Sequence, residues 1–305
     1  MRSKTCIVIS GPTAVGKTAI AIQLAKQFET SIISADSRQC YRETTIAVAK
    51  PSFDELKEVE HYFINSHSIQ DSVTAASFEQ YAISHIEKIF KEKDFAIVVG
   101  GTGLYIKAFI EGLDQVPEID PSLRASIIQQ YETSGMDWLK TSVEREDPDY
   151  YATGEQDNPQ RLMRALEVIR TTGRSIRSFQ SGNKRVRDFR IIHIGIETPR
   201  EELIKRINQR VDQMVSHGLI EEARGLYPYR HLNALQTVGY TELFEYFDNK
   251  ISLEVGIELI KAHTRQYAKR QVTWFKKAGV EAFFRPEKLQ EIIGFVEHKL
   301  QEPKA

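Results

Sequence analysis

The stretch that decides the fold is Cys6-Ile7-Val8-Ile9-Ser10-Gly11-Pro12-Thr13-Ala14-Val15-Gly16-Lys17-Thr18. Its apolar first part, residues 6–10, has the continuous pattern of a strand buried on both faces of a parallel sheet. Residues 11–18 match the phosphate-loop pattern G-x-x-x-x-G-K-[ST] in full. In such a loop, backbone N–H groups and a helix N-terminus face an anion, Lys17 adds positive charge, and the Thr18 hydroxyl can hold Mg²⁺. The stretch therefore predicts a binding site for a diphosphate or a triphosphate.

Further apolar runs predict a sheet around this loop. The runs are Ser31–Ala35, Phe95–Val99 and Ile191–Ile196. Because strands alternate with helical patterns, we predict an α/β fold with a P-loop parallel-sheet core, similar to that of P-loop NTPases. Ligands of such sheets bind at the carboxyl ends of the strands. The polar motifs Asp36-Ser37 and Gly100–Gly103 end two of these runs, so we expect both to lie beside the phosphate loop.

The middle of the chain differs from the rest in charge and in pattern. Asp114–Asp157 holds eleven acidic residues and three basic ones, whereas Arg161–Arg190 holds nine basic residues and two acidic ones. No strand-like run interrupts this stretch. We predict an inserted helical lobe over about 114–188, which divides the core into the segments 1–113 and 189–305.

Helix signals support this division. Asp157 can cap a helix that has Pro159 in its first turn and Gly173 just past its end. After the lobe, a helical face is marked by Leu203, Ile207, Val211 and Met214. A second C-terminal helix is predicted at about 253–277.

The overall composition is that of an ordinary globular protein. The 305 residues are 41% hydrophobic and 27% charged, with a formal net charge of −1. Cys6 and Cys40 provide no disulfide framework, and no apolar run reaches the length of a signal-peptide core or a membrane span. We therefore expect a cytoplasmic protein without membrane contact, and we expect it to be a monomer.

Asp36 is the first candidate for chemistry. It closes a predicted strand beside the phosphate loop, where a carboxylate can hold Mg²⁺, act as a general base or simply cap a turn. Ser37, Arg38 and Gln39 follow it, and each can donate hydrogen bonds; Gln39 suits the edge of a base. The pattern by itself leaves these roles open.

Two further motifs offer groups for a ligand. The strand end at Gly100-Gly101-Thr102-Gly103 lacks the acid that an NTP hydrolase carries there. Its small residues permit either close approach of a ligand or a tight turn, and Thr102 offers one hydroxyl. Arg206 and Arg210 lie one helical turn apart, where one of them can reach a diphosphate leaving group unless they form a solvated face.

Segregated basic residues indicate contact with nucleic acid. Residues 261–278 contain no acid and hold Lys261, His263, Arg265, Lys269, Arg270, Lys276 and Lys277, interleaved with Tyr267, Trp274 and Phe275. In the predicted lobe, Arg161 and Arg164 share one side of a helix whose apolar side includes Leu162. A charge run is usually a solvated face, but segregation within a neutral chain and interleaved aromatics favour nucleic acid.

Taken together, these motifs resemble the tRNA dimethylallyltransferases, also called tRNA isopentenyltransferases. The matching segments are Gly11–Thr18, Asp36–Tyr41, Ala49–Pro51, Val99–Tyr105, Asn158–Arg161, Arg164–Glu167, Val238–Tyr240 and Thr264–Trp274. Several long motifs in the same order are far more specific than a phosphate loop alone. One departure is Ala47-Val48, where the family usually has Gly-Thr, and it concerns the local loop and not the chemistry.

The resemblance implies transfer of a dimethylallyl group from dimethylallyl diphosphate to N6 of adenine 37, in the anticodon stem-loop of tRNAs that read codons beginning with U. It implies Mg²⁺ as cofactor, held by Thr18, and places the diphosphate on residues 11–18. The implied catalytic residues are Asp36, as candidate base at N6, with Thr102, Lys17 and Arg210. With the basic stretches included, the expected tRNA-binding residues are Asp36, Ser37, Arg38, Gln39, Thr102, Arg124, Gln160, Arg161, Leu162, Met163, Arg164, Gly239, Tyr240, Arg265, Lys269 and Arg270.

Two other functions stay open on sequence grounds. An adenylate isopentenyltransferase shares the core and acts on free AMP, ADP or ATP, but it needs neither an inserted lobe nor two arginine-rich stretches. An NTP-driven RNA-binding switch would use the same phosphate loop. The missing acid after Val99 argues against the switch, although Asp36 keeps it possible.

Overall fold

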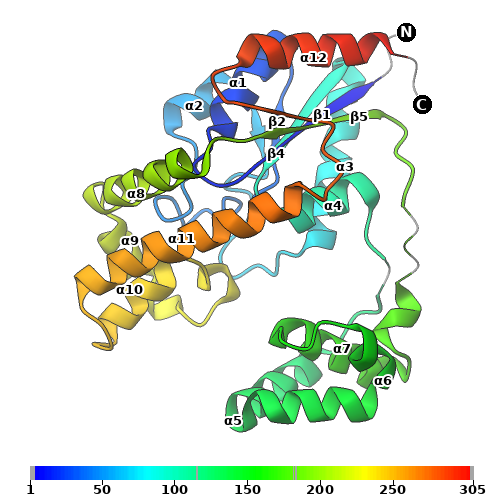
Figure 1. The fold of residues 1–305 in the computed structure, drawn as a ribbon, viewed down its shortest axis with the longest axis vertical. Helices are drawn as coiled ribbons and strands as arrows, with labels where there is room; N and C mark the ends of the chain where they lie inside the picture. Colours follow the sequence, from blue (N-terminus) through cyan, green and yellow to red (C-terminus); the bar gives the residue numbers. More distant parts are fainter. Residues whose placement is uncertain (1–3, 115, 181, 183, 303–305) are drawn as a thin grey trace. The chain divides into compact units, whose positions relative to one another are not determined.

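The computed structural model describes residues 4–114, 116–180, 182 and 184–302. The chain forms two compact units, one made of residues 1–112 with 186–305 and the other of residues 113–185 (Figure 1). We call them the core unit and the lobe. The lobe predicted from the sequence, about 114–188, differs from the unit at 113–185 by one residue at its start and three at its end.

A six-stranded parallel sheet forms the centre of the core unit. In spatial order β3-β2-β4-β1-β5-β6, the strands are His61–Tyr62, Ile32–Ser34, Phe95–Gly100, Thr5–Ser10, Arg190–Ile196 and Ala282–Phe284. The α/β fold and the strands β1, β2, β4 and β5 confirm the sequence prediction. The strands β3 and β6 were not predicted, because runs of two or three residues carry no readable periodicity.

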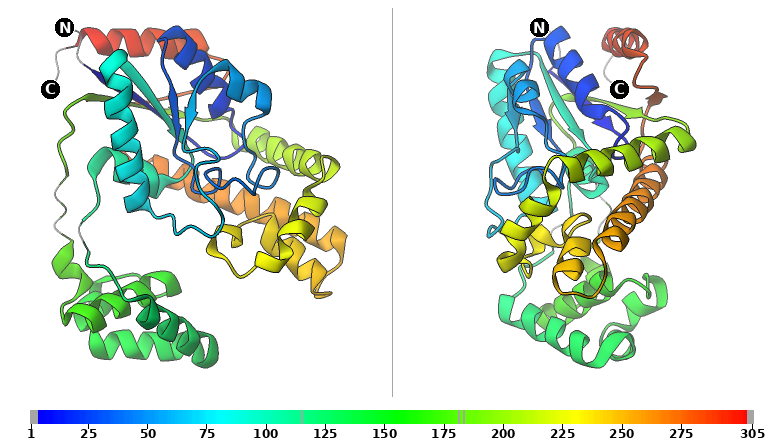
Figure 2. Two further views of the ribbon diagram at one scale, coloured as in Figure 1. Left: turned by 180° about the vertical axis from the view of Figure 1, so that it is seen from behind. Right: turned by 90° about the vertical axis from the view of Figure 1, so that its left-hand side faces the viewer.

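Strand β1 lies between two long neighbours. Ile7 is opposite Ile97 of β4 and Ile192 of β5, and all six residues of β1 are buried. The helices α1 (Lys17–Gln27) and α12 (Leu289–Gln301) share a hydrophobic core with Ile7 and Ile9, and they lie side by side in Figures 1 and 2. The helices α3 (Ala75–Glu92) and α4 (Gly103–Glu111) contact each other and the sheet.

The remaining helices of the core unit follow strand β5, except for α2 (Phe53–Glu58). They are α8 (Arg200–Ser216), α9 (Leu219–Leu226), α10 (Tyr240–Phe247) and α11 (Leu253–Phe275), with the 3-10 turns η2 (Tyr227–Tyr229) and η3 (Asn233–Leu235). The predicted face of α8 is buried at Leu203, Ile207 and Val211, whereas Met214 is only half-buried. Helix α11 packs against α4, α8 and α10. Among the described residues, no helix has both the length and the apolar character that a membrane span requires.

The lobe has a hydrophobic core of its own. It consists of α5 (Pro121–Glu146), α6 (Pro148–Thr153), α7 (Pro159–Thr172) and the 3-10 turn η1 (Ile176–Phe179). Asn158 caps α7, since its side chain accepts hydrogen bonds from two backbone N–H groups of the first turn. The prediction that Asp157 is the cap was wrong; Asp157 forms an ion pair with Lys140 at 2.8 Å.

Candidate active site

The strand order brings the three polar motifs to one edge of the sheet. The strands β2, β4 and β1 are neighbours, so their carboxyl ends place Asp36, Gly100 and the phosphate loop together. The backbone connects two of these motifs directly, because Thr102 N donates to Ala35 O at 3.3 Å. Motifs that are up to about ninety residues apart in the sequence therefore lie together at this edge of the sheet.

The phosphate loop has the tight backbone that its glycines permit. Gly11 has a φ of 154°, and a Cβ there would lie 2.4 Å from the carbonyl oxygen of Ile196. Gly16, at a φ of 103°, leads into α1. Ala14 also has a positive φ, 64°, which costs a non-glycine residue about 1 kcal/mol. The loop therefore stores some backbone strain between its two glycines.

Lys17 lies inside this loop. Its Nζ donates to the carbonyl oxygen of Pro12 at 2.6 Å. Burial lowers the pKa of Lys17 to about 7, against the attraction of the Asp36 carboxylate, and the positive charge of Arg210 lowers it further. An anion bound in the loop would restore favourable surroundings for the charged ammonium.

Asp36 caps the turn that follows β2, and it also faces the site. Its Oδ1 accepts hydrogen bonds from Arg38 N at 2.9 Å and Gln39 N at 3.3 Å. Its Oδ2 has no hydrogen-bond partner within the described part of the chain. Next to it, the Thr102 hydroxyl accepts a hydrogen bond from Ser37 N at 3.1 Å. Asp36 is thus held by one oxygen and leaves the other available.

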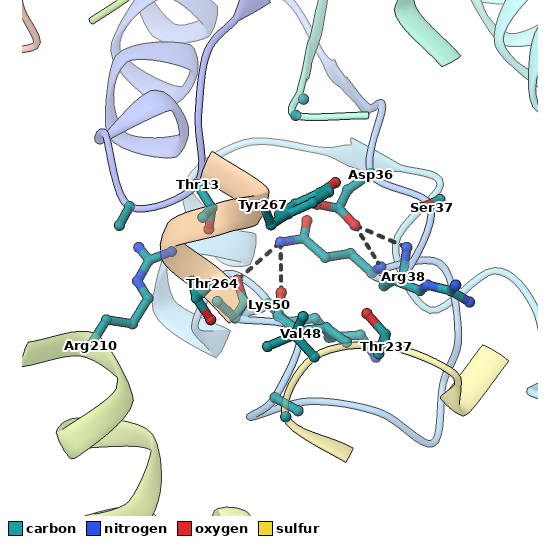
Figure 3. A pocket seen from close by; sticks show the side chains of 18 of the residues that line it. Thr13, Asp36, Ser37, Arg38, Val48, Lys50, Arg210, Thr237, Thr264 and Tyr267 are labelled. Atoms are coloured by element: carbon teal, nitrogen blue, oxygen red, sulfur yellow. Dashed lines mark hydrogen bonds between the residues drawn. The ribbon is translucent and has the colours of Figure 1, made fainter. Parts of the chain in front are cut away.

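Tyr267 of α11 lies beside Asp36 in Figure 3. Burial and the charge of Asp36 raise the pKa of Tyr267 to about 12, while a hydrogen bond with Thr102 acts in the opposite direction. The phenol is therefore neutral and able to donate a hydrogen bond at physiological pH. The sequence pattern indicated Tyr267 only as an aromatic residue within the basic stretch, and its place in the cavity was not predicted.

The glycines of the Gly100–Gly103 motif allow other parts of the protein to pack closely against this turn. A Cβ at Gly100 would lie 2.1 Å from Ala35 O, and one at Gly101 would lie 2.3 Å from Nε2 of Gln271. At Gly103, a Cβ would lie 2.4 Å from Nε1 of Trp274. Close packing of neighbouring parts of the protein accounts for these glycines, a reason that differs from both sequence-based interpretations, approach of a ligand and a tight turn.

A cavity of about 860 Å³ opens at this edge of the sheet. The phosphate loop, Asp36, Arg210 and Tyr267 line it, and an apolar part is formed by Ala47, Val48, Val211, Met214 and Ile260. Figure 3 shows Arg210 reaching from α8 toward Thr13. Burial lowers the pKa of Arg210, and the charge of Glu55 opposes that shift. Arg206, by contrast, pairs with Glu202 and donates to Val15 O at 3.3 Å, so Arg210 is the one of these two arginines that lines the cavity.

A carboxylate that the sequence did not point to holds one wall of the cavity. Glu222 of α9 accepts hydrogen bonds from the backbone N–H groups of three consecutive residues, 45–47, at 2.8 to 3.0 Å. It also accepts from the Tyr240 hydroxyl at 2.7 Å. Ala47, at the unusual Ala47-Val48 position, packs over Gly239, where a Cβ would meet its side chain at 3.2 Å. The departure from the usual Gly-Thr is thus accommodated by the neighbouring glycine.

Three residues expected to bind tRNA use their side chains within the protein. The Gln39 amide donates to Val48 O and Ala49 O at 3.3 and 3.0 Å, and it accepts from Ser34 Oγ at 3.2 Å. Both terminal nitrogens of Arg38 donate to backbone carbonyls, those of Asn233 and Gln236. The Tyr240 side chain is fully buried. These side chains therefore shape the walls of the site and do not project from it.

The basic face of α11 is divided between structural and exposed residues. Lys261 pairs with Asp212 and Glu258, and His263 Nδ1 lies 2.6 Å from the buried Glu242. Arg265 donates to Asn208 Oδ1 at 2.7 Å. Lys269 and Arg270 are exposed, and Arg270 also lines the cavity. Of the three α11 residues expected to bind tRNA, only these two face solvent.

The lobe presents basic side chains on its own surface. Arg124 and Arg164 both pair with the carboxylate of Glu167, which is 2% exposed, at 3.7 and 3.1 Å. Gln160 and Arg161 are exposed, and Arg161 pairs with Glu155. Leu162 and Met163, also expected to bind tRNA, instead lie in the hydrophobic core of the lobe, which excludes their side chains from its surface.

Fold and site together define an α/β protein of the P-loop class, with a partly apolar cavity beside its phosphate loop and a helical lobe. The sequence model described as "IPP transferase" matches residues 39–278. The chain therefore belongs to the IPP transferase family.

Similar proteins support this assignment over nearly the whole chain. The chain is 45% identical to the tRNA dimethylallyltransferase of Cytophaga hutchinsonii, with 98% of this chain and 99% of the relative covered. It is 47% identical to that of Christiangramia forsetii, with the same coverage. The solved structure of the tRNA isopentenylpyrophosphate transferase of Bacillus halodurans superimposes with a TM-score of 0.72 at 34% identity, over 98% and 97% of the two chains. A eukaryotic dimethylallyltransferase acting on tRNA gives 0.74 at 29% identity, over 89% and 70%.

Proposed function

We propose that this protein transfers a dimethylallyl group from dimethylallyl diphosphate to N6 of adenine 37 in tRNAs that read codons beginning with U, and releases diphosphate. The observation that carries the proposal is the placement of Asp36 on the same cavity as the phosphate loop, at a sheet edge whose β4 end lacks a hydrolytic acid. Thr102 adjoins this site through its hydrogen bond with Ser37 N. The apolar part of that cavity suits a five-carbon chain.

The phosphate loop and Arg210 act on the leaving group. The allylic carbon can bear positive charge, so the barrier lies largely in the departure of diphosphate. Backbone N–H groups of the loop, Lys17 and Arg210 stabilise the negative charge that develops there. Loss of one such donor raises the barrier by about 3 kcal/mol.

Thr18 is the residue that would hold Mg²⁺. Within the described residues, no group of three or more His, Cys, Asp or Glu side chains could hold a metal ion. This donor set fits Mg²⁺, which typically keeps several waters and binds through substrate phosphates with few protein ligands. Bound in this way, Mg²⁺ supplies neutralising charge to the diphosphate.

Asp36 serves as the base at N6. The exocyclic amine of adenine is a poor nucleophile, because its lone pair is delocalised into the ring, so removal of its proton assists attack. Two backbone N–H groups fix Oδ1 of Asp36, a residue that lines the cavity, and they leave Oδ2 available for the proton. Thr102, held against Ser37 N and Tyr267, orients the reacting groups beside it.

The RNA contacts come from both units of the protein. The adenine has to leave its stack to enter a cavity, which is easiest in a single-stranded loop. In the core unit, Ser37, Gly239, Lys269 and Arg270 contact RNA, and in the lobe the exposed residues of α7 with Arg124 do so. The side chains of Gln39, Arg38 and Tyr240 form hydrogen bonds within the protein. We therefore assign to them the support of the cavity wall, and not direct contact with RNA.

The decisive assay combines purified protein, Mg²⁺ and labelled dimethylallyl diphosphate with either unmodified tRNA or AMP. We expect label in tRNA and none in AMP, and digestion of the product should place the label on adenine 37. Label in AMP alone would replace this proposal with an adenylate isopentenyltransferase. Label in neither, together with RNA-stimulated ATP hydrolysis, would identify an NTP-driven switch.

A further inference from the structure

Gln271 connects the phosphate loop and the turn after β4 beyond the point where the paired strands β1 and β4 end. It lies on α11 and is 6% exposed. Its Oε1 accepts a hydrogen bond from Thr13 N in the phosphate loop at 2.8 Å, and its Nε2 donates to Gly101 O at 2.8 Å. A single buried amide therefore satisfies one backbone donor of the loop and one acceptor of the turn after β4. The partners lie 258 and 170 residues away along the chain.

The packing around Gln271 leaves it little freedom. Gly101 has no room for a Cβ because Nε2 of Gln271 would lie 2.3 Å away. One turn later, Trp274 fills the corresponding space beside Gly103. Two contacts of this kind along one helix fix α11 against the turn in both position and rotation. The amide is thus held in place from outside the phosphate loop.

The position of Thr13 matters because successive N–H groups of the loop face the anion. Gly101 in turn adjoins Thr102, whose hydroxyl contacts Ser37 N beside Asp36. Gln271 thereby sets the distance between the phosphate loop, which binds the diphosphate, and the pair Thr102 and Asp36, which faces the adenine. A misplacement of about 1 Å in such an arrangement can cost about a hundredfold in rate.

We propose that Gln271 is a positioning residue, which holds the diphosphate loop in register with the Thr102 turn through the two hydrogen bonds of its amide. Both hydrogen bonds of its amide go to backbone atoms, those of Thr13 and Gly101, and not to the Asp36 carboxylate. The inference rests on the proposed function only in taking diphosphate as the ligand of the loop.

The test measures binding of inorganic pyrophosphate with Mg²⁺ to the full-length protein, together with binding of tRNA. Gln271→Ala should weaken pyrophosphate binding by about tenfold, the effect of one lost hydrogen bond, and leave tRNA binding within about twofold. In turnover, the KM for dimethylallyl diphosphate should rise and kcat should fall. The pyrophosphate measurement needs no transfer activity, so its outcome stands apart from that of the transfer assay.

Two controls separate positioning from general stability. Phe275→Leu changes a buried side chain of the same helix that does not line the cavity. Even if it lowers thermal stability as much as Gln271→Ala does, it should bind pyrophosphate like the native protein. Gly101→Ala should weaken pyrophosphate binding in the native background and have little further effect on Gln271→Ala, because the amide it would collide with is gone. Native pyrophosphate binding by Gln271→Ala, an equal loss in Phe275→Leu, or additive effects of the Gly101 and Gln271 changes would each overturn the proposal.

Discussion

His193 provides a quantitative test of how the core beneath the phosphate loop is held. It lies on β5 with 4% of its surface exposed, and its Nε2 is 3.0 Å from Oγ of Ser10, the residue that precedes the loop. Burial lowers the pKa of His193 from 6.5 to about 4, although a hydrogen bond with the backbone of Ala278 acts in the opposite direction. The folded protein therefore keeps this imidazole neutral under mildly acidic conditions.

The size of the effect follows from the difference between the two pKa values. Lowering the pKa of His193 from 6.5 to about 4 on folding corresponds to about 3 kcal/mol in the free energy of unfolding. Because the folded pKa is the lower one, the unfolded state binds more protons between these values. The contribution of His193 to stability is complete above about pH 6.5 and is lost as the pH falls toward 4. At about pH 5 the loss relative to pH 8 is about 2 kcal/mol.

The assay is hydrogen exchange of the β1 and β5 amides, which reports on the core unit separately from the lobe. We compare the native protein with His193→Gln, which is neutral throughout and keeps a polar side chain near Ser10. Because carboxylates titrate alike in both proteins, the difference between their losses of stability reports the contribution of the His193 imidazole alone. The native protein should lose about 2 kcal/mol more than the variant between pH 8 and pH 5. The same loss in both proteins would refute the reasoning.

Three other changes test the site. Asp36→Asn should keep the native affinity for tRNA and lose at least about a hundredfold in single-turnover rate; a near-native rate would remove Asp36 as the base. Lys269→Glu combined with Arg270→Glu should weaken tRNA binding and reduce its salt slope by about two, and an unchanged slope would make this a solvated face. Glu222→Gln should lower the free energy of unfolding by about 2 kcal/mol, because one amide oxygen cannot accept hydrogen bonds from three N–H groups. Tyr240→Phe removes only one hydrogen bond to Glu222 and should cost about 1 kcal/mol, so equal losses in the two variants would contradict the network.

The features that sequence predicted well are local or periodic. The phosphate loop, the long strands and the helical nature of the lobe each leave a pattern within a few residues of themselves. The choice between Asp157 and Asn158 as a helix cap was also decidable. Proline favours the first helical position, so Pro159 assigns the cap to the residue before it. The apolar spacing of Leu162 within its helix likewise indicated a core position.

The features that sequence could not predict depend on partners far along the chain. Glu222 meets the N–H groups of residues 45–47 about 175 positions away, and nothing near either segment signals the contact. Gln39 carries side-chain groups suited to a base edge, yet the fold occupies all of them. A residue type shows what a side chain can bind, whereas the assembled structure decides what it does bind.

The position of β1 in the middle of the sheet has a consequence for synthesis on the ribosome. The strand that leads into the phosphate loop emerges first, but it pairs with residues 95–100 and 190–196, and its core is completed by α12. The nascent chain therefore carries β1 without its second neighbouring strand until residue 196 has been made, and without the cover of α12 until residues 289–301 follow. Such long-range pairing is slow and leaves apolar surface exposed meanwhile. Production of this protein should consequently depend on chaperone capacity and on the rate of translation.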